Sequence, residues 1–193
     1  MKPGDCYIRP AMGGRSRSIW RITEVEGDTC RADLYDFGEQ GIYFYENEPF
    51  SARRFALFIP VDESRFRMVG ALFDSALRNA EDIMKKADKW RSETLEFGTC
   101  LYSEEDGYKG VMKLIEQSGE NSLLGEYIHV SPKQFSRETI RPGIISLSQY
   151  EEDESKMTID PACFDKIHKV FTMACATIQA TVDRASAQAR SSK

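Results

Sequence analysis

The sequence has few of the side chains that usually carry catalysis or bind metal ions. It contains two histidines, His129 and His168, and five cysteines among its 193 residues. The cysteines are odd in number and far apart, unlike those of a secreted disulfide scaffold or a zinc site. A glycine-rich phosphate loop after a strand is also missing, so nucleotide chemistry has no support. We therefore expect no metal site, no cofactor and no catalytic residues.

Long apolar runs are absent as well. No stretch approaches the roughly 18 apolar residues that a membrane-spanning helix needs. The first ten residues, MKPGDCYIRP, lack the apolar centre of a secretion signal. We expect a cytoplasmic chain whose cysteines are reduced and mostly buried.

The charge balance is slightly acidic. The chain has 26 Lys and Arg against 31 Asp and Glu, which gives a net charge of −5. A protein of this sign does not coat nucleic acid or an anionic membrane through its overall charge, although a local basic patch is compatible with it. Hydrophobic residues make up 41% of the sequence, as in an ordinary globular protein with a packed core.

A repeated pattern runs through the sequence. The mid-chain stretch FGTCLYSE (97–104) resembles PGDCYIRP (3–10), with Gly98 over Gly4 and Cys100 over Cys6 at an offset of 94. A duplicated unit changes the prediction for the whole fold. We interpret the pattern as two copies of a unit of about 95 residues. Chance similarity between two β-rich halves is the alternative.

The similarity continues at slightly smaller offsets. Residues 110–127 lie over residues 18–35 at an offset of 92, which places Met112 on Trp20 and Tyr127 on Tyr35. Residues 163–174 lie over residues 72–83 at an offset of 91, with Phe164 on Phe73. Small loop deletions would produce this drift.

The first part of each unit is typical of β-structure. Short segments such as IWRITEVE and GIYFY are rich in β-branched and aromatic residues and partly alternate in polarity. Residues 26–28 (EGD) predict a hairpin turn, and residues 118–121 (SGEN) predict its counterpart. About five short strands joined by tight turns favour a small antiparallel barrel.

The second part of each unit predicts a long amphipathic helix. Apolar residues recur every three or four positions between Glu63 and Glu93, and again from Pro161 onward. Asp160 followed by Pro161 is a typical helix start, and the final residues ASAQARSSK are expected to fray. Helices with such stripes pack on each other or on a second chain, so a homodimer is one expectation.

The segment KPGD, followed after a loop by WRITEVEGDTCRADLY, resembles the opening of SH3-like small barrels of the Tudor and KOW type. The sequence departs from KOW because it lacks the basic, glycine-centred signature. The resemblance implies an α+β fold made by internal duplication of a small antiparallel SH3-like β-barrel followed by a long amphipathic helix. We expect barrels at 1–62 and 95–156 and helices at 63–94 and 157–193. Such barrels usually bind peptides, proteins or nucleic acid.

Two groups of residues are candidates for partner binding. The first lies in residues 6–23, which hold four arginines and no carboxylate and would suit phosphate or an acidic partner: Arg9, Arg15, Arg17 and Arg21. The second is the strand with Tyr43 and Tyr45, whose alternation places both rings on one face and Phe44 on the other. A solvated loop and an ordinary barrel core are the simpler interpretations.

The sequence favours a non-enzymatic, cytoplasmic protein-binding module, such as an adaptor or an immunity-type inhibitor, that recognises a protein through barrel loops and edges. The alternative is a reader of nucleic acid or modified residues that uses the Arg9–Arg21 loop and the Tyr43/Tyr45 strand. An unfamiliar enzyme ranks lower. A pair such as Cys100 with His129 would need adjacency and a lowered thiol pKa, and the sequence indicates neither.

Overall fold

A computed structural model describes residues 1–9, 17–91, 97–117, 123–140 and 157–191. The chain has an α+β architecture and forms two compact units. Unit 1 comprises Met1–Ser75 and Met173–Lys193, and unit 2 comprises Ala76–Thr172. Each long helix therefore contributes one half to each unit.

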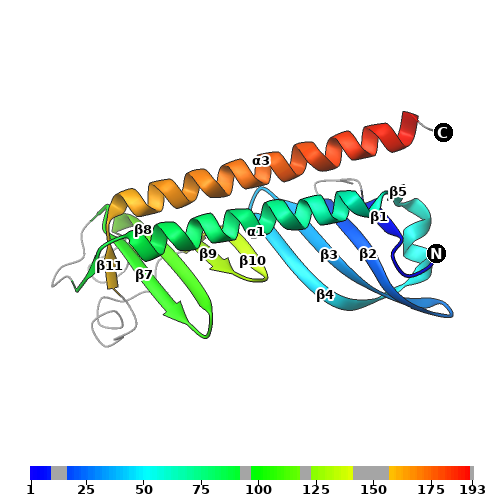
Figure 1. Ribbon diagram of the computed structural model, residues 1–193. Coiled ribbons are helices and arrows are strands. Elements are labelled where there is room, and N and C mark those ends of the chain that lie inside the picture. The colour runs from blue at the N-terminus through cyan, green and yellow to red at the C-terminus, as the bar shows by residue number, and fades with distance from the viewer. Residues whose placement is uncertain (10–16, 92–96, 118–122, 141–156, 192–193) are drawn as a thin grey trace. The chain divides into compact units, whose positions relative to one another are not determined.

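Unit 1 contains an antiparallel sheet with the strand order β5-β1-β2-β3-β4 (Figure 1). Its elements are β1 (Cys6–Arg9), β2 (Arg17–Glu26), β3 (Thr29–Gly38), β4 (Gly41–Ser51), the 3-10 helix η1 (Ala52–Leu57), β5 (Ile59–Val61) and the start of α1 (Glu63–Lys86). The predicted turn at residues 26–28 is confirmed, since β2 and β3 meet there and Gly27 has a φ of 58°.

Unit 2 contains an antiparallel sheet with the strand order β10-β9-β8-β7-β11-β6. Its elements are β6 (Lys89–Trp90), β7 (Cys100–Glu105), β8 (Tyr108–Gln117), β9 (Leu123–Ser131), β10 (Gln134–Ile140), β11 (Met157–Ile159) and the start of α3 (Pro161–Ser191). The turn predicted at residues 118–121 lies outside the described residues.

The prediction of tandem SH3-like barrels was wrong, because the sheets are open. In unit 1, β5 and β4 stand at opposite ends of the strand order, and no pairing among the described residues joins them into a barrel. Alternation and tight turns are the same in a closed barrel and in an open sheet with one face under a helix. Closure depends on pairing between distant strands, which local patterns do not specify.

The two units share the order of five strands and their first hydrogen bonds, and unit 2 has β6 as an additional strand beside β11. Gly4 and Gly98 both have positive φ, 91° and 87°, and their N–H groups donate to Ile22 O at 2.9 Å and to Leu114 O at 2.8 Å. The last strand before each helix, β5 or β11, pairs with the first strand of its own unit. Equivalent residues of the two units can therefore be assigned from register.

The register corrects the sequence alignment of the helices. Asp62 O accepts a hydrogen bond from Arg65 N at 2.9 Å, and Asp160 O accepts one from Cys163 N at 2.8 Å. The helix starts are thus equivalent at an offset of 98, which places Phe164 on Phe66 and not on Phe73. The sequence alignment of the helices was therefore wrong by seven residues. Seven residues make about two helical turns, so the apolar stripe of a helix matches itself again after that shift.

The third strands were misaligned by one residue. Ile19 pairs with Tyr35, while Val111 pairs with Ile128. Tyr35 is therefore equivalent to Ile128, and Tyr127 points to the opposite face of its sheet. A shift of one residue in register moves every side chain of a strand to the opposite face of the sheet.

Helix α1 ends at Lys86, earlier than residue 94 expected from the sequence. The Lys89 ammonium donates to Met84 O at 2.8 Å, and cationic side chains commonly satisfy the last carbonyls of a helix in this way. Trp90, expected on the apolar stripe, pairs with Thr158 of β11 instead. Helix α3, by contrast, includes most of the end that was expected to fray and continues to Ser191.

One face of the unit 1 sheet packs against α1 through Tyr35. Its ring lies 5.2 Å from that of Phe66 and 5.6 Å from that of Phe73. A Cβ atom at Gly70 would approach the Tyr35 hydroxyl to 2.9 Å, so the absence of a side chain there allows close contact. Figure 1 shows α1 crossing this sheet.

The opposite face of the same sheet carries a second hydrophobic cluster covered by η1. Trp20, 2% exposed, is its centre and contacts the rings of Phe50, Phe55 and Phe58 at centroid distances of 4.4, 5.4 and 5.6 Å. The unit 1 sheet is thus buried on both faces near Trp20.

Neither helix, within the described part of the chain, is long and apolar enough to cross a membrane.

None of the five cysteines, all of which the structure describes, forms a disulfide, and four of them are buried. Burial raises the pKa of Cys6 and Cys163 to about 11 and that of Cys100 to about 12. Burial also raises the pKa of Cys30.

We expect these four thiols to resist alkylation in the native protein. At about pH 8 a thiol of pKa 11 is deprotonated in only about one molecule in a thousand, and the thiolate is the nucleophile. Iodoacetamide labelling with peptide mapping should therefore modify the half-buried Cys175 first, and all five only after unfolding. Rapid native labelling of Cys100 would contradict its burial.

Candidate binding site at the edge of unit 1

The predicted arginine group does not form one anion site among the described residues. Arg15 lies outside them. Arg9 pairs with Asp36 at 3.3 Å, Arg17 with Asp183, and Arg21 with Asp33 at 2.6 Å. By register, Arg17 and Arg21 lie on the helix face of the sheet, and Arg9 lies on the opposite face. Binding of a partner by these residues stays a prediction.

Arg21 has a clear structural role. It lies over the ring of Phe66 at 5.0 Å and also faces Glu63 at 3.8 Å. Its hydrogen bond to Asp33, whose side chain is 8% exposed, raises the pKa of the Arg21 guanidinium. The second Asp33 oxygen accepts Asn47 N at 3.0 Å. Arg21 thus neutralises a buried carboxylate and joins the sheet to α1.

The predicted alternation at Tyr43 and Tyr45 is confirmed. Tyr43 pairs with Asp36 and Tyr45 with Leu34, both on the face opposite α1, while Phe44 stacks on Tyr35 at 4.8 Å. Tyr45 is 42% exposed and Tyr43 is half-buried. The pair is accessible, and its use in binding stays a prediction.

Cys100 and His129 lie on opposite faces of the unit 2 sheet. Cys100 pairs with Lys113 on the helix side, whereas His129 pairs with Gly110 on the other side. His129 Nε2 is bound to Glu138 Oε1 at 2.5 Å. A thiol and imidazole pair is therefore not formed. The described residues also contain no group of three His, Cys, Asp or Glu that could hold a metal ion.

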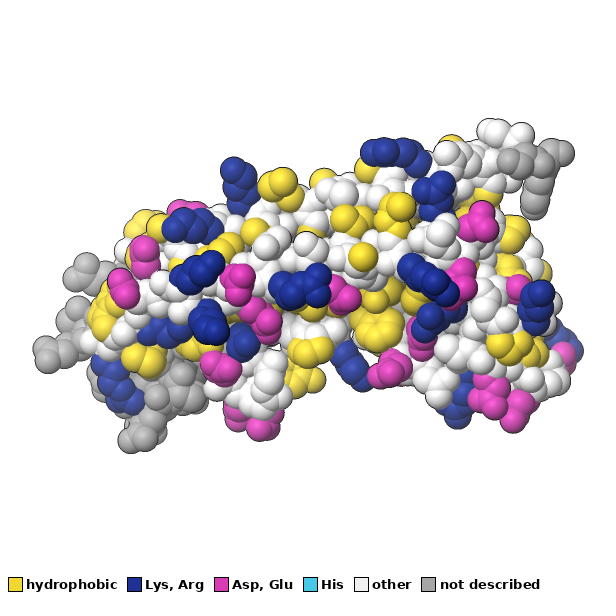
Figure 2. Space-filling view, viewed as in Figure 1, with side chains coloured by type: hydrophobic (Ala, Val, Ile, Leu, Met, Phe, Trp, Pro, Cys, Tyr) yellow, Lys and Arg dark blue, Asp and Glu magenta, His cyan; other side chains and the backbone are white. Residues whose placement is uncertain are grey.

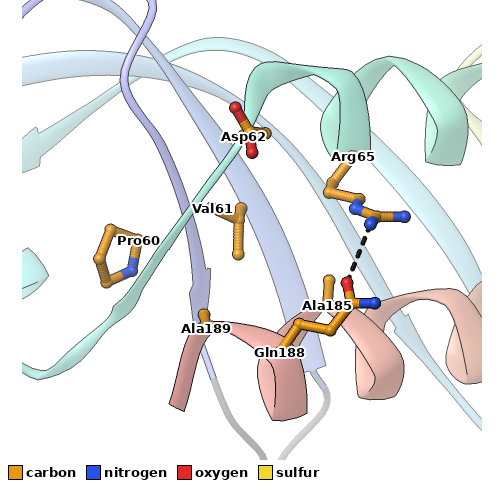
Figure 3. Close-up of a pocket in the computed structure, with 7 residues that line it drawn as sticks. All are labelled: Pro60, Val61, Asp62, Arg65, Ala185, Gln188 and Ala189. Carbon is orange, nitrogen blue, oxygen red and sulfur yellow. Dashed lines mark hydrogen bonds between the residues drawn. The ribbon is translucent and has the colours of Figure 1, made fainter. Parts of the chain in front are cut away.

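A pocket of about 440 Å³ lies at the edge of unit 1 (Figure 3). Its lining mixes apolar and polar side chains and exposes more polar than apolar surface, the lining residues being Pro60, Val61, Asp62, Arg65, Ala185, Gln188 and Ala189. The first three come from β5 and the start of α1, and the last three from the end of α3. Arg65 reaches across the pocket, and its Nη2 donates to Gln188 Oε1 at 2.9 Å.

The strand beside the pocket stands at the end of the sheet. β5 is paired with β1 on one side and is the first strand in the order. Pro60, in its centre, has no N–H group, so this edge offers fewer donors to an added strand. Side chains entering the pocket are therefore a better basis for recognition here than β-strand addition.

An exposed apolar side chain precedes the pocket in the chain. Leu57, at the end of η1, is 77% exposed, although Phe55 of the same helix is buried in the cluster around Trp20. Phe55 anchors η1 and thereby holds Leu57 outward, three residues before Pro60. Leu57 thus lies close in the chain to Pro60 and Val61, which line the pocket, and we call Leu57 together with the pocket the edge site.

The sequence contained a weak signal for the edge site. The ASAQA segment at the end of α3 has small side chains, which leave space when a helix packs beside a strand. As the end of the chain, it was expected to fray. Only its packing in unit 1 brings Ala185 and Ala189 into the lining of the pocket.

Comparison of the chain with family models, with curated proteins and with solved structures finds no match. The function must therefore be argued from the geometry of the chain itself.

Proposed function

We propose that the chain is a non-enzymatic protein-binding module that holds a segment of a partner protein at the edge site. The observation that carries this proposal is the pocket of about 440 Å³, lined by both apolar and polar side chains and preceded in the chain by a leucine that is 77% exposed. Concave sites of several hundred Å³ with a few convergent polar groups are typical of ligand sites.

Two further observations support a protein partner. The face in view in Figure 2 has acidic and basic side chains interspersed, without a broad field of one sign that would favour nucleic acid. The three described arginines of the predicted loop are engaged by carboxylates, which weakens the alternative of a nucleic-acid reader. We also propose that the protein works in a reducing compartment such as the cytoplasm, because none of its five cysteines forms a disulfide.

The edge site can be tested by selecting short random peptides on the wild-type protein by phage display. We expect peptides that bind the wild type and bind Ala189→Gln at least about tenfold more weakly, since the longer side chain fills the pocket. Ala187→Gln is the matched control, because Ala187 is exposed on the same helix and does not line the pocket. Leu57→Ser should also weaken binding, whereas Ala56→Ser should not.

Circular dichroism of each variant must show an unchanged fold. Equal peptide binding by Ala189→Gln and Ala187→Gln would overturn the proposed function. A selection that yields no binders would overturn it as well.

A further inference from the structure

The edge site has a cation whose hydrogen-bonding capacity is largely unused. A guanidinium has five N–H donors, and Arg65 makes one bond, to the neutral amide oxygen of Gln188. No carboxylate pairs with Arg65 in the part of the chain that the structure describes. Arg67, two residues later, differs from Arg65 because its guanidinium binds a carboxylate, Glu63 Oε1, at 3.0 Å.

The charge near the pocket is mixed. Arg65 and Asp62 line it, and Glu63 follows Asp62 in the chain. Of the arginines in the neighbouring segment, Arg53 pairs with Asp28 and Arg54 lies over the ring of Phe50. Arg65 is thus the lining cation that an acidic ligand would meet.

We propose that the partner segment is both acidic and apolar, an inference that rests on the proposed function of the edge site. A carboxylate of the segment binds Arg65, and a neighbouring apolar side chain lies on Val61 and Ala189. The bond to Gln188 holds the guanidinium in place before binding, which lowers the entropy lost when a carboxylate is bound. The planar, paired N–H groups of a guanidinium bind a carboxylate more strongly than they bind a neutral amide.

Asp62 limits where the acidic group binds. It is the one carboxylate that lines the pocket, it is exposed, and it lies at the start of α1 beside β5. A second negative charge next to it would be repelled. The segment's carboxylate therefore binds on the Arg65 side, and Asp62 is left to accept a backbone N–H group of the segment.

The test uses the peptides from the phage selection, sorted by their loss of binding to Ala189→Gln. We expect the pocket-dependent peptides to be enriched in Asp or Glu next to an apolar residue. Arg65→Gln should weaken them about tenfold or more at low salt, and added salt should reduce this difference. Arg67→Gln is the matched control and should change binding less than about twofold, because Arg67 is exposed on the same helix outside the pocket.

Each outcome decides one of the two proposals. Pocket-dependent peptides that are neutral or basic, or that ignore Arg65→Gln, would overturn the acidic partner and leave the edge site standing. Absence of any pocket-dependent peptide would overturn both. A single-stranded oligonucleotide that displaces the peptides would show that Arg65 serves nucleic acid, which also contradicts the inference.

Discussion

Trp20→Ala is expected to lower the free energy of unfolding by about 3–5 kcal/mol, the usual range for removing a buried aromatic side chain. Trp20 is 2% exposed and contacts three phenylalanine rings in the cluster under η1. Its indole Nε1 also donates to Ser18 Oγ at 2.6 Å, so the substitution removes a buried hydrogen bond as well. Urea unfolding followed by circular dichroism gives the measurement.

The second tryptophan supplies the control. Trp90 is 43% exposed in the two-residue strand β6, and Trp90→Ala should cost less than about 1 kcal/mol. Because the chain has two tryptophans, each variant also isolates the fluorescence of the other. Equal losses from the two substitutions would mean that the cluster under η1 does not form as described.

Arg21→Met is expected to cost about 2–3 kcal/mol. The substitution leaves Asp33, 6% exposed, without its cationic partner, and uncompensated buried charges are strongly destabilising. We place the loss below the range for fully buried pairs because the Arg21 side chain is 36% exposed and water screens the interaction. Arg31→Met, which removes an exposed pair with Glu24 in the same sheet, should cost less than about 1 kcal/mol.

A double variant separates charge from packing at this position. In Arg21→Met with Asp33→Leu both members of the pair are apolar, and we expect it to recover part of the lost stability. The sequence offered Arg21 as a partner-binding residue. If Arg21→Met left unfolding unchanged but abolished peptide binding, that functional interpretation would be correct and the structural one wrong.

The two predictions concern residues whose roles differ in how far the sequence revealed them. Trp20 lies in a segment rich in β-branched and aromatic residues that predicts a strand, and a large apolar side chain in such a strand is expected to be buried. Arg21 follows it in the chain and points to the other face, where its partner Asp33 lies twelve positions away. Charge alone did not distinguish a guanidinium that meets a buried carboxylate from one that is free to bind.

The candidate site shows the same limit more strongly. Its defining hydrogen bond joins Arg65 to Gln188, which are 123 positions apart in the chain. Pro60 and Ala189 have no feature that marks them as neighbours. The four arginines expected to bind a partner are close in the chain and alike in type, and the three that the structure describes lie on two faces of the sheet.

The sequence by itself determined strands β1 to β4, the turn at Gly27, the helix start at Asp160 and the opposite faces of Tyr43 and Phe44, whereas β6 and β11 lie in ranges expected to be helical. These features depend on interactions within a few residues, which periodicity and turn chemistry describe. Only the tertiary structure decided that the sheets stay open, that Arg21 is engaged with Asp33, and that β5 and the end of α3 enclose a pocket. Those outcomes depend on contacts between distant segments, whose energies are not encoded in any local pattern.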